Sequence, residues 1–153
     1  MAPLSPGDAE VALRTFPRRW RALLGGLDED DPDTAARLQR TGPDGRTAVG
    51  AASEAAAILE VAEGQVRATL RSERPSLPPG DEPSPATLDE ALDRIEAAAP
   101  ALAATVAGIA ADDLDREADL AGTTVTVRSL VADVVERVAG LLRAADRALH
   151  ASG

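Results

Sequence analysis

The apolar residues between Thr126 and His150 restrict the fold of this chain more than any other feature of its sequence. They recur at steps of three and four residues over about six turns, which is the repeat of an amphipathic helix. The set consists of Val127, Leu130, Val131, Val134, Val138, Leu141, Leu142, Ala145 and Leu149. The opposite face carries charged residues that water can solvate, namely Arg128, Glu136, Arg137, Arg143, Asp146 and Arg147. The pattern predicts a helix over 126–150 that buries one face against other helices.

Three earlier segments carry similar apolar stripes, and they predict helices over about residues 6–27, 46–71 and 85–111. Two of these helices have recognisable starts, at Ser5-Pro6 and at Ser84-Pro85. Serine caps the first backbone amides of a helix, and proline suits the first helical position. The chain therefore contains four long helical segments.

The connections between these helices are polar or rich in proline. Five prolines between residues 72 and 85 indicate an extended path over the surface. Residues 112–124 form a polar bridge, and the β-branched residues of 122–127 predict a short extended piece there. Pro17 and Pro100 fall inside expected helices and predict kinks. We expect one domain over residues 1–153, an all-α four-helix bundle of the up-and-down type.

The composition excludes several classes of function. The chain has 16 basic and 26 acidic residues, a net charge of −10, and 1% aromatic residues. Such a chain repels phosphate backbones and cannot stack bases, so we expect no nucleic-acid partner. The absence of cysteine excludes disulfides, thiolate nucleophiles and thiolate metal ligands. No apolar segment approaches the roughly 20 residues that cross a bilayer, and no signal peptide is visible, so we expect a cytoplasmic protein without a membrane partner.

Candidate functional residues are few. Glu54 stands among alanines on the side of its helix that carries Ile58, and it is either partly buried with a partner or at the rim of the bundle. Trp20 either closes the core or lines a ligand cavity between the helices. His150 is the only histidine, which argues against a Ser-His-Asp arrangement. The acidic run 28–33 lacks the twelve-residue loop and central glycine of an EF-hand calcium site.

A family pattern is spread over nearly the whole chain. It lies in ALRTFPRRWRALL (12–24), RTAV (46–49), ASEA (52–55), QVRATL (65–70), LDR (114–116) and the stretches 122–130 and 136–149. Together these passages resemble the superfamily of DinB-like and mycothiol-dependent maleylpyruvate isomerase-like proteins. The resemblance implies a four-helix bundle that is often dimeric, so a homodimer is an expected partner. It also implies, for many members, a divalent metal that activates a thiol such as mycothiol or bacillithiol for transfer or isomerisation.

In that family the metal is held by a histidine of the second helix and two residues of the last helix, commonly at i and i+4. Transferred by position, the histidine falls at Glu54. The pair falls at Val134 and Val138, or at Glu136 and Gly140 if the register is shifted, and the apolar stripe favours the valines. Neither register supplies the three ligands that a tight site needs. We therefore expect no metal and no cofactor.

The sequence thus predicts a DinB-like protein without the metal triad that binds a small molecule or another protein. The expected cavity residues are Trp20, Glu54, Ile58, Val134 and Val138. The alternative is a metal- and thiol-dependent S-transferase or isomerase of the mycothiol type that rebuilds its site from Glu54 and a second carboxylate. A third hypothesis is a structural bundle whose relevant property is self-association.

Overall fold

The computed structural model describes residues 5–77 and 87–151, and these are predominantly helical. The helices are α1 (Pro6–Leu24), α2 (Pro32–Gln39), α3 (Ala48–Arg71), α4 (Leu88–Ala107) and α5 (Val127–Leu149), with a short 3-10 helix η1 (Ala111–Asp115). Strands β1 (Ser76–Leu77), β2 (Glu117–Leu120) and β3 (Thr123–Thr126) form one small sheet. The described residues are therefore consistent with the predicted all-α fold class, apart from this small sheet. Within the described ranges, no helix has both the length and the apolar character needed to cross a bilayer.

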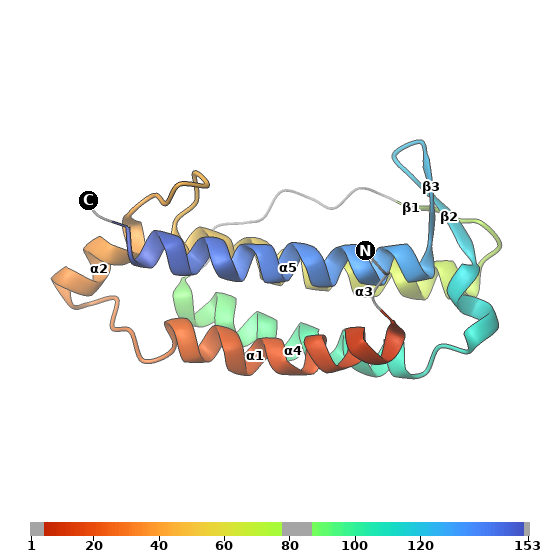
Figure 1. Ribbon diagram of the computed structural model, residues 1–153, viewed down its shortest axis with the longest axis horizontal. Coiled ribbons are helices and arrows are strands. Elements are labelled where there is room, and N and C mark those ends of the chain that lie inside the picture. The colour runs from red at the N-terminus through yellow and green to blue at the C-terminus, as the bar shows by residue number, and fades with distance from the viewer. Residues whose placement is uncertain (1–4, 78–86, 152–153) are drawn as a thin grey trace.

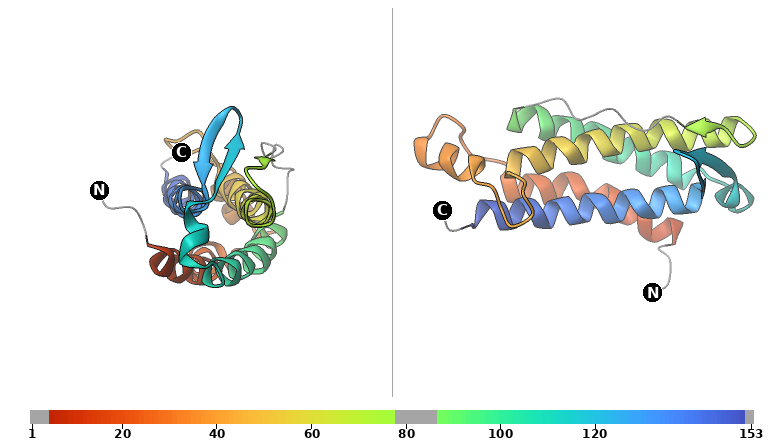
Figure 2. Two further views of the ribbon diagram at one scale, coloured as in Figure 1. Left: turned by 90° about the vertical axis from the view of Figure 1, so that its right-hand side faces the viewer. Right: turned by 90° about the horizontal axis from the view of Figure 1, so that it is seen from above.

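The four long helices lie side by side around a common core (Figures 1 and 2). Helix α1 packs against α4 and α5, and α3 packs against the same two helices. Helices α1 and α5 run in one direction, whereas α3 and α4 run in the other (Figure 1). Successive helices therefore do not alternate in direction, and the expected up-and-down order is wrong for the step from α3 to α4.

The length of the connection between α3 and α4 explains this parallel arrangement. Helix α3 has 24 residues and is about 36 Å long, whereas residues 72–87 can span about 50 Å when extended. The chain can therefore return to the opposite end of the bundle before α4 begins. The expected helix start at Ser84-Pro85 lies outside the described residues. Helix α4 begins instead at Leu88, with Thr87 as its N-cap.

Other helix boundaries also differ from the expected ones. Helix α1 ends at Leu24 rather than at residue 27, and Gly25 and Gly26 follow it as the turn out of the helix. The expected polar linker before α3 contains an eight-residue helix, α2, which Asp31 caps. Helix α4 ends at Ala107, four residues before the expected end at 111, and continues through Pro100. Helix α5 begins as predicted, because Thr126 and Ser129 cap each other's backbone amides at 3.1 and 2.9 Å.

The core is made from the inward faces of the long helices. From α1 it receives Leu13, Phe16 and Trp20, all fully buried. Helix α3 contributes mainly small residues, namely Ala48, Ala51, Ala52, Ala55, Ala56 and Ala62, besides Leu59 and Val66. Because alanine has a short side chain, neighbouring backbones can approach α3 closely. The Trp20 Nε1 atom is buried and has no hydrogen-bond partner among the described residues.

The small sheet lies at the end of the bundle where α3 finishes and α5 begins (Figure 1). Strands β2 and β3 are antiparallel, with Glu117 opposite Thr126 and Leu120 opposite Thr123. Ala121 and Gly122 turn the hairpin with positive φ angles of 50° and 83°, as a tight two-residue hairpin turn requires. Strand β1 pairs with β2 in parallel. The extended piece predicted near 122–127 is therefore one strand of a hairpin.

Candidate functional site

The five predicted cavity residues separate into two groups. Trp20, Val134 and Val138 are buried in the core. Glu54 and Ile58 are only partly buried, and they line a cleft between α3 and α5 with a volume of about 260 Å³. We call this space the Glu54 cleft. Its other lining residues are Asp44, Arg46, Arg137, Gly140, Leu141, Ala144 and Arg147.

Two ion pairs form the walls of the Glu54 cleft. Arg46 donates from Nε and Nη2 to the two carboxylate oxygens of Glu54, at 2.7 and 3.2 Å. Arg147 donates from Nε and Nη2 to Asp44 Oδ2, at 2.9 and 2.6 Å. Glu54 raises the pKa of Arg46, first through these side-chain hydrogen bonds and second through charge attraction. Both guanidinium groups therefore face carboxylates that hold them in fixed positions.

Local structure at the start of α3 explains how Arg46 reaches Glu54. Thr47 is the N-cap of α3, and its Oγ1 accepts a hydrogen bond from the Gly50 amide at 2.9 Å. Arg46 stands just before this cap, while Glu54 lies two turns into the helix. The Arg46 side chain therefore extends forward along the first two turns of α3 to meet the carboxylate.

The segment 40–46 is fastened to the end of α5. Gly42 lies so close to this helix that a Cβ atom on it would stand 2.9 Å from the Ala148 Cα. Arg40 donates from Nη1 to the Ala151 carbonyl at 3.1 Å, and the Gly42 amide donates to the Arg46 carbonyl at 2.9 Å. These contacts place Asp44 at the cleft. The contacts of Arg40 with Ala151 and of Gly42 with Ala148 connect residues far apart in the sequence, so the helical pattern gave no signal for them.

The donor set of the Glu54 cleft does not fit a divalent cation. Val134 and Val138 carry no donor atoms, and neither of them lines the cleft. In the shifted register Gly140 has no side chain, and Glu136 is exposed and lies outside the lining. Both oxygens of Glu54 accept hydrogen bonds from Arg46. Within residues 5–77 and 87–151, no group of three or more His, Cys, Asp or Glu side chains is placed to hold a metal ion.

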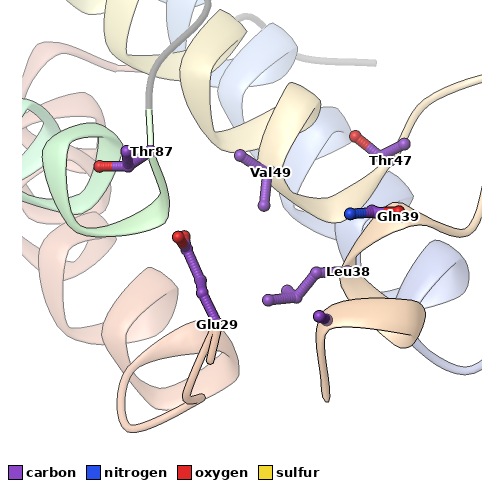
Figure 3. A pocket seen from close by; sticks show the side chains of 7 residues that line it. Glu29, Leu38, Gln39, Thr47, Val49 and Thr87 are labelled. Atoms are coloured by element: carbon purple, nitrogen blue, oxygen red, sulfur yellow. The ribbon is translucent and has the colours of Figure 1, made fainter. Parts of the chain in front are cut away.

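A second pocket lies between α2 and the first turns of α3 and α4, with a volume of about 360 Å³. Glu29, Leu38 and Val49 point into this space (Figure 3). Glu29 Oε1 accepts a hydrogen bond from the Leu88 amide at 2.7 Å, so its carboxylate caps the start of α4. This role was not visible in the sequence, where Glu29 was one member of the acidic run 28–33. We assign Glu29 a structural role, because its carboxylate already accepts a hydrogen bond from a free backbone amide at the start of α4 and lies near the positive end of that helix dipole.

The only histidine does not contribute to the Glu54 cleft. His150 ends α5, with Nδ1 2.9 Å from the Asp146 carbonyl oxygen and 3.2 Å from the Asp146 carboxylate. The comparisons with known proteins add no family assignment, because the sequence matches no family model and no curated protein. The chemistry of the cleft therefore has to be argued from its own side chains.

Proposed function

We propose that this chain is a DinB-like four-helix bundle without the metal triad of that family, and that it binds a small carboxylate in the Glu54 cleft. The observation that carries the proposal is the excess of guanidinium groups at this site. Three arginines and two carboxylates line the cleft, although the whole chain has a net charge of −10. The third arginine, Arg137, is held only by a 3.8 Å contact with Asp133, which lies outside the lining. The lining itself therefore has one more positive than negative group, which favours an anionic ligand.

Arg137 is the cation best placed to receive that ligand. Arg46 and Arg147 already bind Glu54 and Asp44 at short distances. The ion pair of Arg137 with Asp133 is longer, at 3.8 Å, and both side chains are more than half exposed. Exposed pairs of this kind contribute little free energy. A carboxylate can therefore displace Asp133 and accept two parallel hydrogen bonds from the planar guanidinium.

The shape of the cleft sets the size of the ligand. Its volume of about 260 Å³ is just below the range of sites for drug-sized molecules. Gly140 leaves open space beside the cationic groups, because the nearest atom to an added Cβ would be Arg143 Nη2 at 3.8 Å. Ile58 and Leu141 supply apolar wall. These features favour a dicarboxylate or amino acid of about five carbons.

The test is isothermal titration of the full chain with glutarate at low ionic strength. We expect saturable binding with a Kd of about 1 mM or tighter. Arg137→Gln should weaken glutarate binding about tenfold, because a charge-assisted hydrogen bond is lost. Arg128→Gln is the matched control, since Arg128 lies on α5 but pairs with Asp115 outside the cleft. The charge-reversed probe 1,5-diaminopentane should not bind. Equal binding of both probes, or unchanged glutarate binding by Arg137→Gln, would contradict the proposal.

The absence of the metal triad has its own test. Elemental analysis of protein purified without an affinity tag should find less than stoichiometric zinc or nickel. The physical reason is that the arginines of the cleft repel a cation and occupy both oxygens of Glu54. A stoichiometric metal held by the protein would overturn this part of the proposal.

A second candidate function is a metal- and thiol-dependent S-transferase or isomerase of the mycothiol type, and the placement of Glu54 favours it. The Glu54 side chain is 29% exposed and lines an open cleft rather than the closed core. This hypothesis predicts thiol-dependent turnover that Glu54→Ala abolishes. Full thiol-dependent activity in the Glu54→Ala variant would show that Glu54 takes no part in such a reaction.

A further inference from the structure

A groove on the other flank of α5 has a different character from the Glu54 cleft. It lies between α1 and α5 and has a volume of about 440 Å³. Its lining residues are Arg19, Ala22, Leu23, Leu142, Arg143 and Asp146. Half of these lining residues are apolar, and of them Leu142 is buried while Leu23 is half-buried. We call it the α1–α5 groove.

The two arginines of the α1–α5 groove have no carboxylate partner. Neither Arg19 nor Arg143 forms an ion pair or a hydrogen bond with any described residue, although acidic residues outnumber arginines in this chain. Arg19 lies over the ring of Phe16, with its guanidinium carbon 5.8 Å from the ring centroid. Such a contact orients the guanidinium without neutralising its charge. Two arginines from different helices, neither held in an ion pair with a described residue, therefore line one groove that is half apolar.

Asp146 is the one anionic group of this lining, and it already has a neighbour. Its carboxylate lies 3.2 Å from Nδ1 of His150. The lining retains a net positive charge of one, counting Arg19 and Arg143 against Asp146. A purely cationic or neutral apolar ligand would leave both guanidinium groups without a counter-charge.

We propose that the α1–α5 groove binds an amphiphilic monocarboxylate, with its carboxylate between Arg19 and Arg143 and its hydrocarbon chain along Leu23 and Leu142. The charge complementarity selects the headgroup, and the apolar lining selects the tail. The groove is larger than the Glu54 cleft, as a ligand of eight or more carbons requires. The two sites share no lining residue, although Arg143 Nη2 stands 3.8 Å from where a Cβ on Gly140 of the Glu54 cleft would be.

The experiment is isothermal titration of the full chain with hexanoate, octanoate and decanoate at low ionic strength. We expect the Kd to fall about three- to tenfold with each two added methylene groups, because burying a methylene is favourable. Arg19→Gln and Arg143→Gln should each weaken octanoate binding about three- to tenfold. Arg143→Lys keeps the charge and should restore most of the affinity. Shifts of the amide and methyl NMR signals of Ala22, Leu23 and Leu142 should locate the probe in the groove.

Matched controls separate this proposal from simpler explanations. Arg14→Gln changes an exposed arginine of α1 that pairs with Glu10 outside the groove, and it should leave octanoate binding unchanged. Glu54→Gln and Arg137→Gln should also leave it unchanged, so failure of one site does not imply failure of the other. Octylamine should not bind, and 1-octanol should bind more weakly than octanoate.

Three results would overturn the proposal. The first is no saturable octanoate binding. The second is octanol binding as tight as octanoate binding, or unchanged octanoate affinity in both arginine variants, because the guanidinium groups would then have no part in it. The third is a dimer in sedimentation that Arg143→Gln dissociates while octanoate does not bind, because a second copy would then fill the groove.

Discussion

Gly42 allows a direct test of how the Glu54 cleft is built. Replacing it by alanine would place a Cβ atom 2.9 Å from the Cα of Ala148 and 3.0 Å from the nitrogen and Cβ of the same residue. Two of these three atoms belong to the backbone of the last turn of α5, so no rotamer change can move them away. Either the contact is compressed or the segment 40–46 moves off the helix.

The relative costs of these two responses set the expected effect. Compressing a packed contact of this kind costs typically 1–3 kcal/mol. Moving the segment would break the Arg147–Asp44 pair, whose side chains are 48% and 34% exposed, at a cost of up to about 1 kcal/mol. It would also break the hydrogen bond from Arg40 to the Ala151 carbonyl, at about 1 kcal/mol. We therefore expect Gly42→Ala to lose about 1–2 kcal/mol of unfolding free energy, with Asp44 displaced from the cleft.

Urea denaturation followed by circular dichroism measures this loss by linear extrapolation. Gly64→Ala is the matched control, because Gly64 lies within α3 and an added Cβ meets no atom within 4 Å. That control should gain about 0.5–1 kcal/mol, since alanine has the higher helix propensity. Gly42→Ala should also bind glutarate more weakly than Gly64→Ala does. If Gly42→Ala is as stable as the parent and binds glutarate equally well, segment 40–46 does not rest on α5 as described.

Three further changes test other parts of the structure. Thr126→Ala removes one side of the capping box of α5 and should lower the free energy of unfolding by about 1 kcal/mol. The melting temperature Tm should then fall by about 2–4 °C. An unchanged Tm would contradict the role of Thr126 as the helix cap. Gly140→Ala should stabilise α5 by about 0.5–1 kcal/mol in urea denaturation while its methyl group narrows the Glu54 cleft and weakens glutarate binding. A hydrogen bond from Arg21, 2.8 Å long, lowers the pKa of Glu96 below its ordinary value of 4.5. Glu96→Gln should therefore cost under about 1 kcal/mol at pH 7. The difference from the parent should shrink as the pH falls from the ordinary value through the lowered pKa, because the parent then loses its charged carboxylate; a difference that is constant from pH 7 to pH 3 would refute the pairing.

The helices of this chain could be predicted from its sequence because their signals are local. The apolar stripe of α5 and its Thr126 cap both lie within the segment they describe, and the structure has both. The direction of α4 relative to α3 could not be predicted this way. It depends on how a long connection is routed, and the periodicity within a helix carries no information about that route. The same limit applies to α2, whose Asp31 cap lies in a segment that otherwise has the composition of a loop.

The candidate site was predicted in part, and for a physical reason. The alanine-rich surroundings of Glu54 left it either partly buried with a partner or at the rim of the bundle, and the structure places it partly buried at a cleft, paired with Arg46. Its partner Arg46 lies eight residues away, beyond the three- and four-residue spacing that connects side chains on one helix face. Asp44 and Arg147 are separated by more than 100 residues. Pairings of this range depend on the packing of α3 against α5, and no pattern within either helix indicates them.

The arginines on the surface of this protein differ in whether they form ion pairs between helices. Arginines such as Arg21 and Arg94 form ion pairs across helices, with Glu96 and Glu60 respectively, and such pairs favour one alignment of the helices over others. Several other arginines form no ion pair with any residue that the structure describes. Two of these, Arg19 and Arg143, lie beside the apolar side chains of the α1–α5 groove. Unpaired cations beside apolar surface create an electrostatic preference for anions that neither the total charge nor the helical pattern shows.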